Sequence, residues 1–211
     1  MLKALIFLLV SFGSICDAKC SFNTSKYLYE LSNPSSINSI DIDISKSKKW
    51  ASNSLKIIID KSPIINRKYK KKFKAKIIVH YDFGICSFKG KVRQTGDNKD
   101  HIEYNGFKAK QSLNVDLDTG NILSATSFKL LLPNTRGGDN EIFGTLLLRQ
   151  LGYIAPKTFS VRSRINSDII SYTFQENPKK ELLERNGRRE GPIFEGDESL
   201  VGENFLTAKS D

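Results

Sequence analysis

The stretch that decides the fold covers residues 127–184 and opens with SFKLLLPNTRGGDNEIFGTLLLRQLG at 127–152. Its first residues predict a short strand that carries Lys129 and ends at Pro133. A Gly-rich loop follows, and apolar residues then recur at helical spacing, which predicts an amphipathic helix over 139–152. The last part, RINSDIISYTFQENPKKELLE at 164–184, predicts two strands joined by a tight turn and a shorter helix over 178–185.

The first half of the chain has the two-residue periodicity of half-buried strands. Ile40, Ile42 and Ile44 alternate with polar residues, and other segments are rich in β-branched side chains. The strands that we predict here cover residues 40–44, 55–60, 75–81, 85–92 and 112–117. Together with the later elements, they predict an α+β fold with a largely antiparallel β-sheet and one main helix.

The N-terminus has the pattern of a secretion signal. Lys3 precedes a short apolar run, and Ala18 with Cys16 two positions earlier forms a small-x-small cleavage site. The run is too short to span a bilayer, which takes about 20 apolar residues. We therefore predict a signal peptide over residues 1–19, with an uncleaved anchor as the alternative. An exported protein, periplasmic or secreted, follows, with no transmembrane segment after cleavage.

Cysteine usage fits this compartment. Cleavage removes Cys16 and leaves Cys20 and Cys86, an even pair that predicts one disulfide in an oxidising environment. Two unpaired thiols are the alternative. No CxxC motif or Cys/His cluster occurs, so we expect no metal site, and the two histidines, His80 and His101, are not expected to form a ligand pair.

The chain is strongly basic, with a formal net charge of +10. Much of the excess lies in residues 67–76, where lysines alternate with Phe73 and Ala75. Such alternation is typical of the solvent face of a strand, with the Lys stems lying along it. The alternative is a face that contacts an anionic partner. Nucleic acid is not the partner expected of an exported protein.

The order of elements in 127–184 is that of a kinase small lobe, which uses a cation, a carboxylate and a flexible loop to hold phosphates. Lys129 would be the cation and Glu141 its carboxylate partner, with Asp139 as the rival. Glu176 would close the last strand at the hinge. Upstream, Arg93 could reach a phosphate and Gly96 would allow close backbone approach. Each of these residues taken alone is more typical of a solvated surface or a turn.

The segment FKLLLPNTRGGDNEIFGTLLLRQLGYIAPKTFSVRSRINSDIISYTFQE resembles the CotH kinase family, the atypical kinases related to spore coat protein H. Five features carry the resemblance: Lys129, Leu151-Gly152, Ala155-Pro156, Ile165-Asn166 and Glu176. It covers roughly residues 90–185 and corresponds to the small lobe only. Ser167 stands where the family usually has Gly. The resemblance implies ATP and Mg as cofactors and phosphoryl transfer to an exported protein substrate.

No Asp-x4-Asn motif follows Glu176, so we expect the catalytic lobe to be missing or degenerate, and we assign no catalytic residue. The expected organisation is a β-rich region over 20–120, a CotH-like segment over 121–185, and a loop or tail over 186–211, with truncation left open. The alternative function is a non-enzymatic exported β-rich module. It would bind an anionic glycan, an anionic surface or an acidic protein through a basic strand face.

Overall fold

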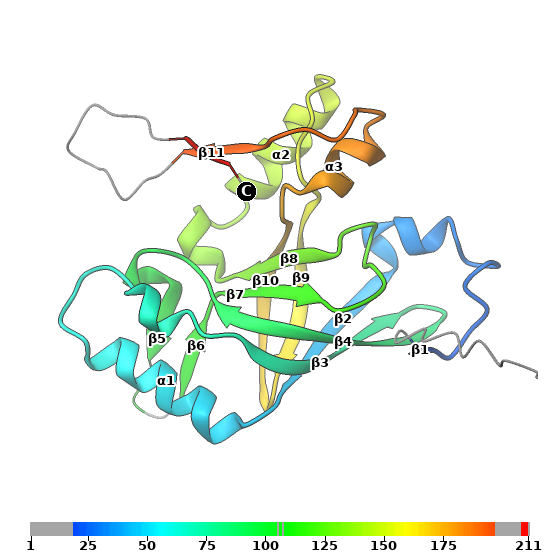
Figure 1. The fold of residues 1–211 in the computed structure, drawn as a ribbon. Coiled ribbons are helices and arrows are strands. Elements are labelled where there is room, and N and C mark those ends of the chain that lie inside the picture. Colours follow the sequence, from blue (N-terminus) through cyan, green and yellow to red (C-terminus); the bar gives the residue numbers. More distant parts are fainter. Residues whose placement is uncertain (1–18, 105, 107, 197–207, 211) are drawn as a thin grey trace, which may run out of the picture.

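A β-barrel with three α-helices around it forms the body of the protein (Figure 1). The structure is a computed structural model that describes residues 19–104, 106, 108–196 and 208–210. It is an α+β fold with a mostly antiparallel sheet, as the sequence predicts.

The element bounds follow the predicted strands closely, except in one segment. The α-helices are α1 Ser47–Ile59, α2 Asn140–Gln150 and α3 Lys180–Arg185. The strands are β1 Lys19–Cys20, β2 Ile37–Ile44, β3 Phe73–Tyr81, β4 Gly84–Gln94, β5 Ile102–Tyr104, β6 Ala109–Gln111, β7 Leu113–Leu117, β8 Ser127–Leu131, β9 Thr158–Ile165, β10 Asp168–Glu176, β11 Phe194–Gly196 and β12 Ala208–Ser210. Short 3-10 turns are η1 Glu30–Ser32, η2 Pro34–Ser36, η3 Arg67–Tyr69, η4 Lys99–His101 and η5 Pro133–Arg136.

Seven strands close on themselves in the order β4-β3-β2-β9-β10-β8-β7, because β4 also pairs with β7. The neighbours are antiparallel except for β2 and β9, which run parallel. The expectation of a kinase-like small-lobe sheet is therefore wrong: the sheet is a closed barrel. Periodicity shows where strands lie, but the two pairings that close the barrel join segments far apart in the chain, and periodicity carries no information about such partners.

The barrel interior holds the hydrophobic core. Alternate residues of each strand point inward, and many of them have no exposed surface, among them Ile42, Ile77, Val92, Phe128 and Phe174. The intervening residues form the outer wall. The polar residues that alternate with this core, which include the candidate site residues Arg93 and Lys129, therefore lie on the outside of the barrel.

Helix α1 replaces a predicted strand. Residues 55–60 were expected to be extended because three consecutive isoleucines favour strands, and this prediction is wrong. Trp50, Ser54 and Ile57 recur at helical spacing, and all three are buried. Trp50 packs edge-on against Phe73 at the start of β3, with 5.2 Å between ring centroids. In Figure 1, α1 lies beside the β5–β6 hairpin below the barrel.

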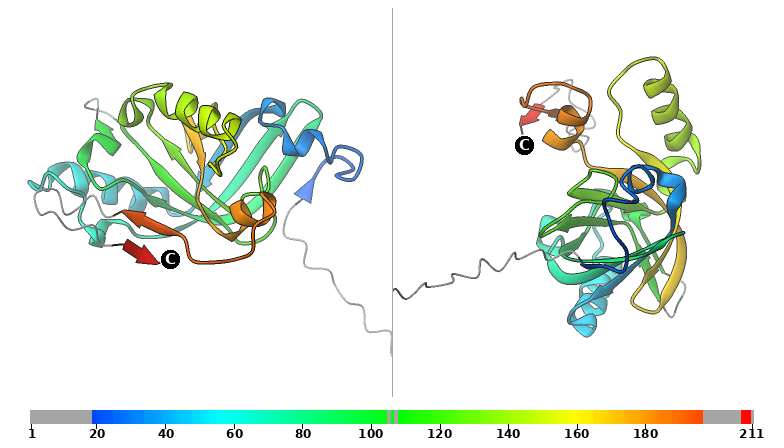
Figure 2. Two further views of the ribbon diagram at one scale, coloured as in Figure 1. Left: turned by 90° about the horizontal axis from the view of Figure 1, so that it is seen from above. Right: turned by 90° about the vertical axis from the view of Figure 1, so that its right-hand side faces the viewer.

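Helices α2 and α3 fall within the predicted segments 139–152 and 178–185, and they lie on the other side of the barrel from α1 (Figure 1). In Figure 2, α2 projects away from the barrel wall. The helix exposes its apolar residues Phe143, Leu146 and Leu147, and Leu151 just after its end is exposed as well. Only Thr145 of the helix is buried. The apolar face that predicted this helix thus does not pack into the core.

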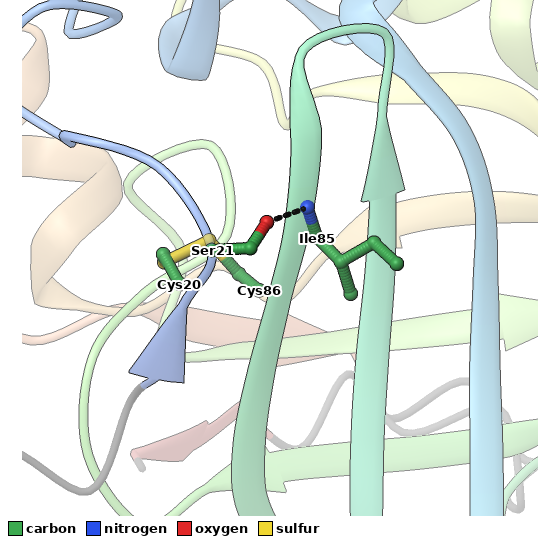
Figure 3. The surroundings of a disulfide bond; sticks show 4 residues. All are labelled: Cys20, Ser21, Ile85 and Cys86. Carbon is green, nitrogen blue, oxygen red and sulfur yellow. Dashed lines mark hydrogen bonds between the residues drawn. A yellow bond between two sulfur atoms is a disulfide. The ribbon is translucent and has the colours of Figure 1, made fainter.

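The Cys20–Cys86 disulfide is present and fastens β1 to β4 (Figure 3). The Ser21 hydroxyl accepts a hydrogen bond from the Ile85 amide at 2.9 Å, and the Ser21 amide donates to the Ile85 carbonyl at 2.9 Å. The predicted signal peptide lies outside the described residues, apart from Lys19.

The C-terminal segment forms further structure. After α3 the chain continues to β11, which pairs antiparallel with β12. The expected boundary near residue 120 falls between β7 and β8, which pair with each other in the same barrel. None of the helices in the described residues is long and apolar enough to cross a membrane.

Candidate functional site

Two of the candidate cations lie in one row on the outer wall of the barrel. Arg93 on β4 is paired with Asn114 on β7, and Asn114 is paired with Lys129 on β8. The row continues to Gln175 on β10. Neighbouring strands lie about 4.8 Å apart, so the Cα atoms of Arg93 and Lys129 are roughly 10 Å apart and their long side chains can reach the same ligand.

Three residues of this row, Arg93, Asn114 and Lys129, form one wall of a cleft of about 770 Å³. The other side of the cleft comes from the start of α3 and from the segment that follows it, including Lys179, Glu181 and Glu190. Five cations and three carboxylates line the cleft: Lys72, Arg93, Lys129, Lys179 and Lys180, with Asp116, Glu181 and Glu190. The cleft is therefore polar, with an excess of positive charge.

Asp116 organises the charges in the cleft. Its carboxylate accepts a hydrogen bond from Ser127 at 2.8 Å and lies 3.1 Å from the ammonium group of Lys72 and 3.7 Å from that of Lys179. Burial alone would raise the pKa of Asp116, but the Ser127 hydrogen bond and the Lys72 charge outweigh it and hold this pKa below its usual value. Asp116 therefore stays ionised and offsets part of the charge of these two lysines.

Arg93 differs from those lysines, because it forms no salt bridge within the described residues. Next to it, the Asn114 side chain is held by two partners. Its amide donates to Asp116 at 3.2 Å, and its carbonyl oxygen accepts a hydrogen bond from Asn177 at 2.8 Å. The wall is thus ordered beside a cation that has no carboxylate partner in this part of the chain.

Glu141, the expected partner of Lys129, lies next to the row. Its carboxylate accepts a hydrogen bond from the Gln175 side chain, and Gln175 is the β10 neighbour of Lys129. Helix α2 therefore places an acid over the strand adjacent to Lys129. Glu141 does not line the cleft itself, and its rival Asp139 does not line it either.

Glu176 is held by contacts that stabilise the fold. It lies on the inward face of β10, with 1% of its surface exposed, and Arg185 of α3 donates hydrogen bonds to both of its oxygens, at 2.5 and 2.7 Å. The Lys157 amide donates to the same carboxylate at 3.0 Å, and the Glu176 amide donates to the Lys157 carbonyl at 2.9 Å. These groups hold α3 against the barrel end.

Gly96 lies outside the cleft, in the turn after β4. Its φ is +90°, and a Cβ atom there would lie 2.0 Å from the ring of His101. His101 is buried and lies 2.9 Å from the Ser112 hydroxyl, and burial is the main reason that its pKa is lowered. The packing of the His101 ring therefore requires glycine at this turn. The close approach that Gly96 permits is between its backbone and the His101 side chain.

The described residues include no group of three or more His, Cys, Asp or Glu side chains that could hold a metal ion. The cations on the cleft wall suit phosphate oxygens.

Sequence reasoning found Arg93 and Lys129 but missed the other residues of the cleft. A signal for Asn114 and Asp116 was available, because they alternate with Leu113, Val115 and Leu117 and must therefore face away from the core. Lys72 and the residues around α3 reach the cleft only through the fold of the chain.

No family model matches this chain, and neither does any curated protein. The resemblance to the CotH kinase family therefore remains a prediction from its motifs.

Proposed function

We propose that this chain is an exported binding protein whose cleft takes a small ligand carrying phosphate groups. The observation that carries the proposal is the row Arg93–Asn114–Lys129, which places two cations about two strand spacings apart on one wall. Binding, without a chemical step, is what these residues support.

Arginine and lysine act differently on phosphate. The Arg93 guanidinium can donate two parallel hydrogen bonds to one phosphate, whereas Lys129 acts as a point charge. The cleft volume of about 770 Å³ lies within the range of about 300–1,000 Å³ that is usual for small-molecule sites. A nucleotide fits these dimensions, and ATP is the ligand that the CotH resemblance implies.

Export is the second part of the proposal. It rests on the predicted signal over residues 1–19 and is supported by the Cys20–Cys86 disulfide, since such bonds persist in oxidising compartments. A ligand or partner outside the cytoplasm follows from it.

Isothermal titration of the purified protein with ATP, with and without Mg, tests the proposal. We expect binding that Arg93→Ala and Lys129→Ala each weaken about tenfold, because each change removes a charge-assisted contact. Arg162→Ala is the matched control, since Arg162 is an exposed arginine on the outer face of β9, away from the cleft. Folded protein that does not bind millimolar ATP, or binding that Arg93→Ala leaves unchanged, would refute the proposal.

A further inference from the structure

A second groove, of about 660 Å³, lies between α1 and the start of β3. It shares Lys72 with the cleft but is lined by none of the residues of the row Arg93–Asn114–Lys129. Seven lysines line it, and no Asp or Glu is among its lining residues: Lys46, Lys48, Lys49, Lys56, Lys71, Lys72 and Lys74. We call it the lysine groove. The sequence showed only half of it, because the α1 lysines lie in a segment where no helix was predicted.

The positive charge of the lysine groove is largely uncompensated. Lys72 lies 3.1 Å from Asp116, but the other six lysines form no salt bridge with any described residue. All seven are exposed. Other lysines of the same basic run have carboxylate partners: Lys68 has Asp60 and Lys70 has Asp97. Six of the seven groove lysines thus carry a charge that no described carboxylate offsets.

The orientation of α1 adds to this charge. The positive end of a helix dipole lies at its N-terminus, where acidic residues are favourable. Helix α1 has no acidic residue in its first turn and no side-chain cap, and its N-cap residue is Lys46. Lys48 and Lys49 follow within the first turn. An anion bound in the groove would supply the negative charge that this helix end lacks.

The groove is held in shape by three contacts between its two sides. The Ser45 amide donates to the Lys74 carbonyl at 2.8 Å, and the Asn53 side chain donates to the Tyr69 carbonyl at 2.8 Å. Trp50 and Phe73 pack against each other beneath it. The lysines therefore project from a preformed surface, which reduces the ordering that a ligand must impose on the protein.

We infer that the lysine groove binds an acidic polysaccharide. Seven cations along a concave surface match a chain that carries an anionic group on successive units. Two exposed serines of the lining, Ser45 and Ser52, offer hydroxyl groups to sugar hydroxyls. Phe73 is the single aromatic residue of the lining and is half-buried, so the groove has no exposed ring on which nucleic-acid bases would stack. A membrane surface would be better matched by a convex face with apolar side chains.

Fluorescence anisotropy with a labelled heparin hexasaccharide measures this binding directly. The groove variant is Lys48→Ser/Lys49→Ser/Lys56→Ser, three exposed changes on one helix. The control variant is Lys26→Ser/Lys61→Ser/Arg162→Ser, which removes the same charge from exposed positions outside both the cleft and the groove. We expect the groove variant to lose roughly tenfold or more in affinity at low salt and the control to stay within about threefold.

Three results would overturn the inference. One is an equal loss in both variants, which would mean that net charge alone attracts the sugar. Another is equal or tighter binding of poly-glutamate, single-stranded DNA or vesicles of anionic lipid of comparable charge. The third is no binding of the hexasaccharide at low salt. Arg93→Ala is expected to leave sugar binding unchanged, so the groove and the nucleotide cleft are tested separately.

Discussion

The contact between Arg185 and Glu176 gives the sharpest test of how the fold is held together. The Glu176 side chain is 1% exposed, and its carboxylate accepts two hydrogen bonds from the guanidinium group of Arg185, whose side chain is 22% exposed. Removing one partner of a buried ion pair costs about 3–5 kcal/mol, since it leaves a charge unmatched. We expect Arg185→Ala to cost about 3 kcal/mol, near the lower limit of this range, for two reasons. Arg185 is partly exposed, and the Glu176 carboxylate keeps its hydrogen bond from the Lys157 amide.

Urea unfolding followed by circular dichroism, with the disulfide intact, measures this change. With a slope of about 2 kcal/mol per molar urea, a loss of about 3 kcal/mol lowers the midpoint by about 1.5 M. Glu176→Gln keeps a hydrogen-bond acceptor, so we expect it to cost about 1–2 kcal/mol. The double variant Arg185→Ala/Glu176→Gln should cost less stability than the sum of the two single changes, with a coupling energy of about 2 kcal/mol.

The matched control is Arg188→Ala, three residues further on, where the arginine is exposed. It should stay within about 0.5 kcal/mol of the parent protein. Two results would contradict this expectation: an Arg185→Ala variant that behaves like the control, or additive effects of the two changes at the ion pair. Either outcome would mean that α3 is not held to the barrel by Glu176.

Two further predictions follow from burial. Burial raises the pKa of the Tyr81 hydroxyl to about 12, against about 10 in an unfolded chain. The native state therefore holds this proton more tightly than the unfolded state does. As a result, about 2–3 kcal/mol of stability that is present below pH 10 is lost as the pH rises to 12. Tyr81→Phe should remove that dependence from denaturation midpoints measured over this range, and an unchanged slope would contradict it. Phe143→Ser, at a site that is 67% exposed, should change stability by less than about 0.5 kcal/mol. Phe128→Ala in the core should cost about 3–5 kcal/mol in the same urea assay. Similar losses in the two variants would mean that Phe143 of α2 is packed as closely as a core residue.

Local patterns in the sequence predicted most of the strands and two of the three α-helices, because alternation and helical spacing record which side of an element is buried. They failed at α1, where Ile57, Ile58 and Ile59 favour a strand although Trp50, Ser54 and Ile57 share one helix face. They also could not predict that β4 pairs with β7 or that β2 pairs with β9. Those pairings depend on tertiary packing, and they turn an expected kinase-like sheet into a barrel.

The same limit applies to the candidate site. Arg93 and Lys129 could be selected by residue type and strand position, and the barrel brings them to one wall. The environments of Gly96 and Glu176 could not be foreseen, because His101 and Arg185 reach them only in the folded chain. Residue types suggest an anion site, but three-dimensional neighbours decide which glutamate or glycine is structural.

The parallel pairing of β2 with β9 also bears on the rate and order of folding. It joins residues 39–42 to residues 162–165, and Arg164 donates to Asp41 across this joint, 123 positions away in the chain, at 3.0 Å. Pairings of such long range slow folding, because the intervening chain must lose its freedom before the contact forms. During synthesis or export, the edges of β2 and β9 must stay open until most of the protein has emerged. We therefore expect closure of the barrel to be late, after the β3–β4 hairpin has formed.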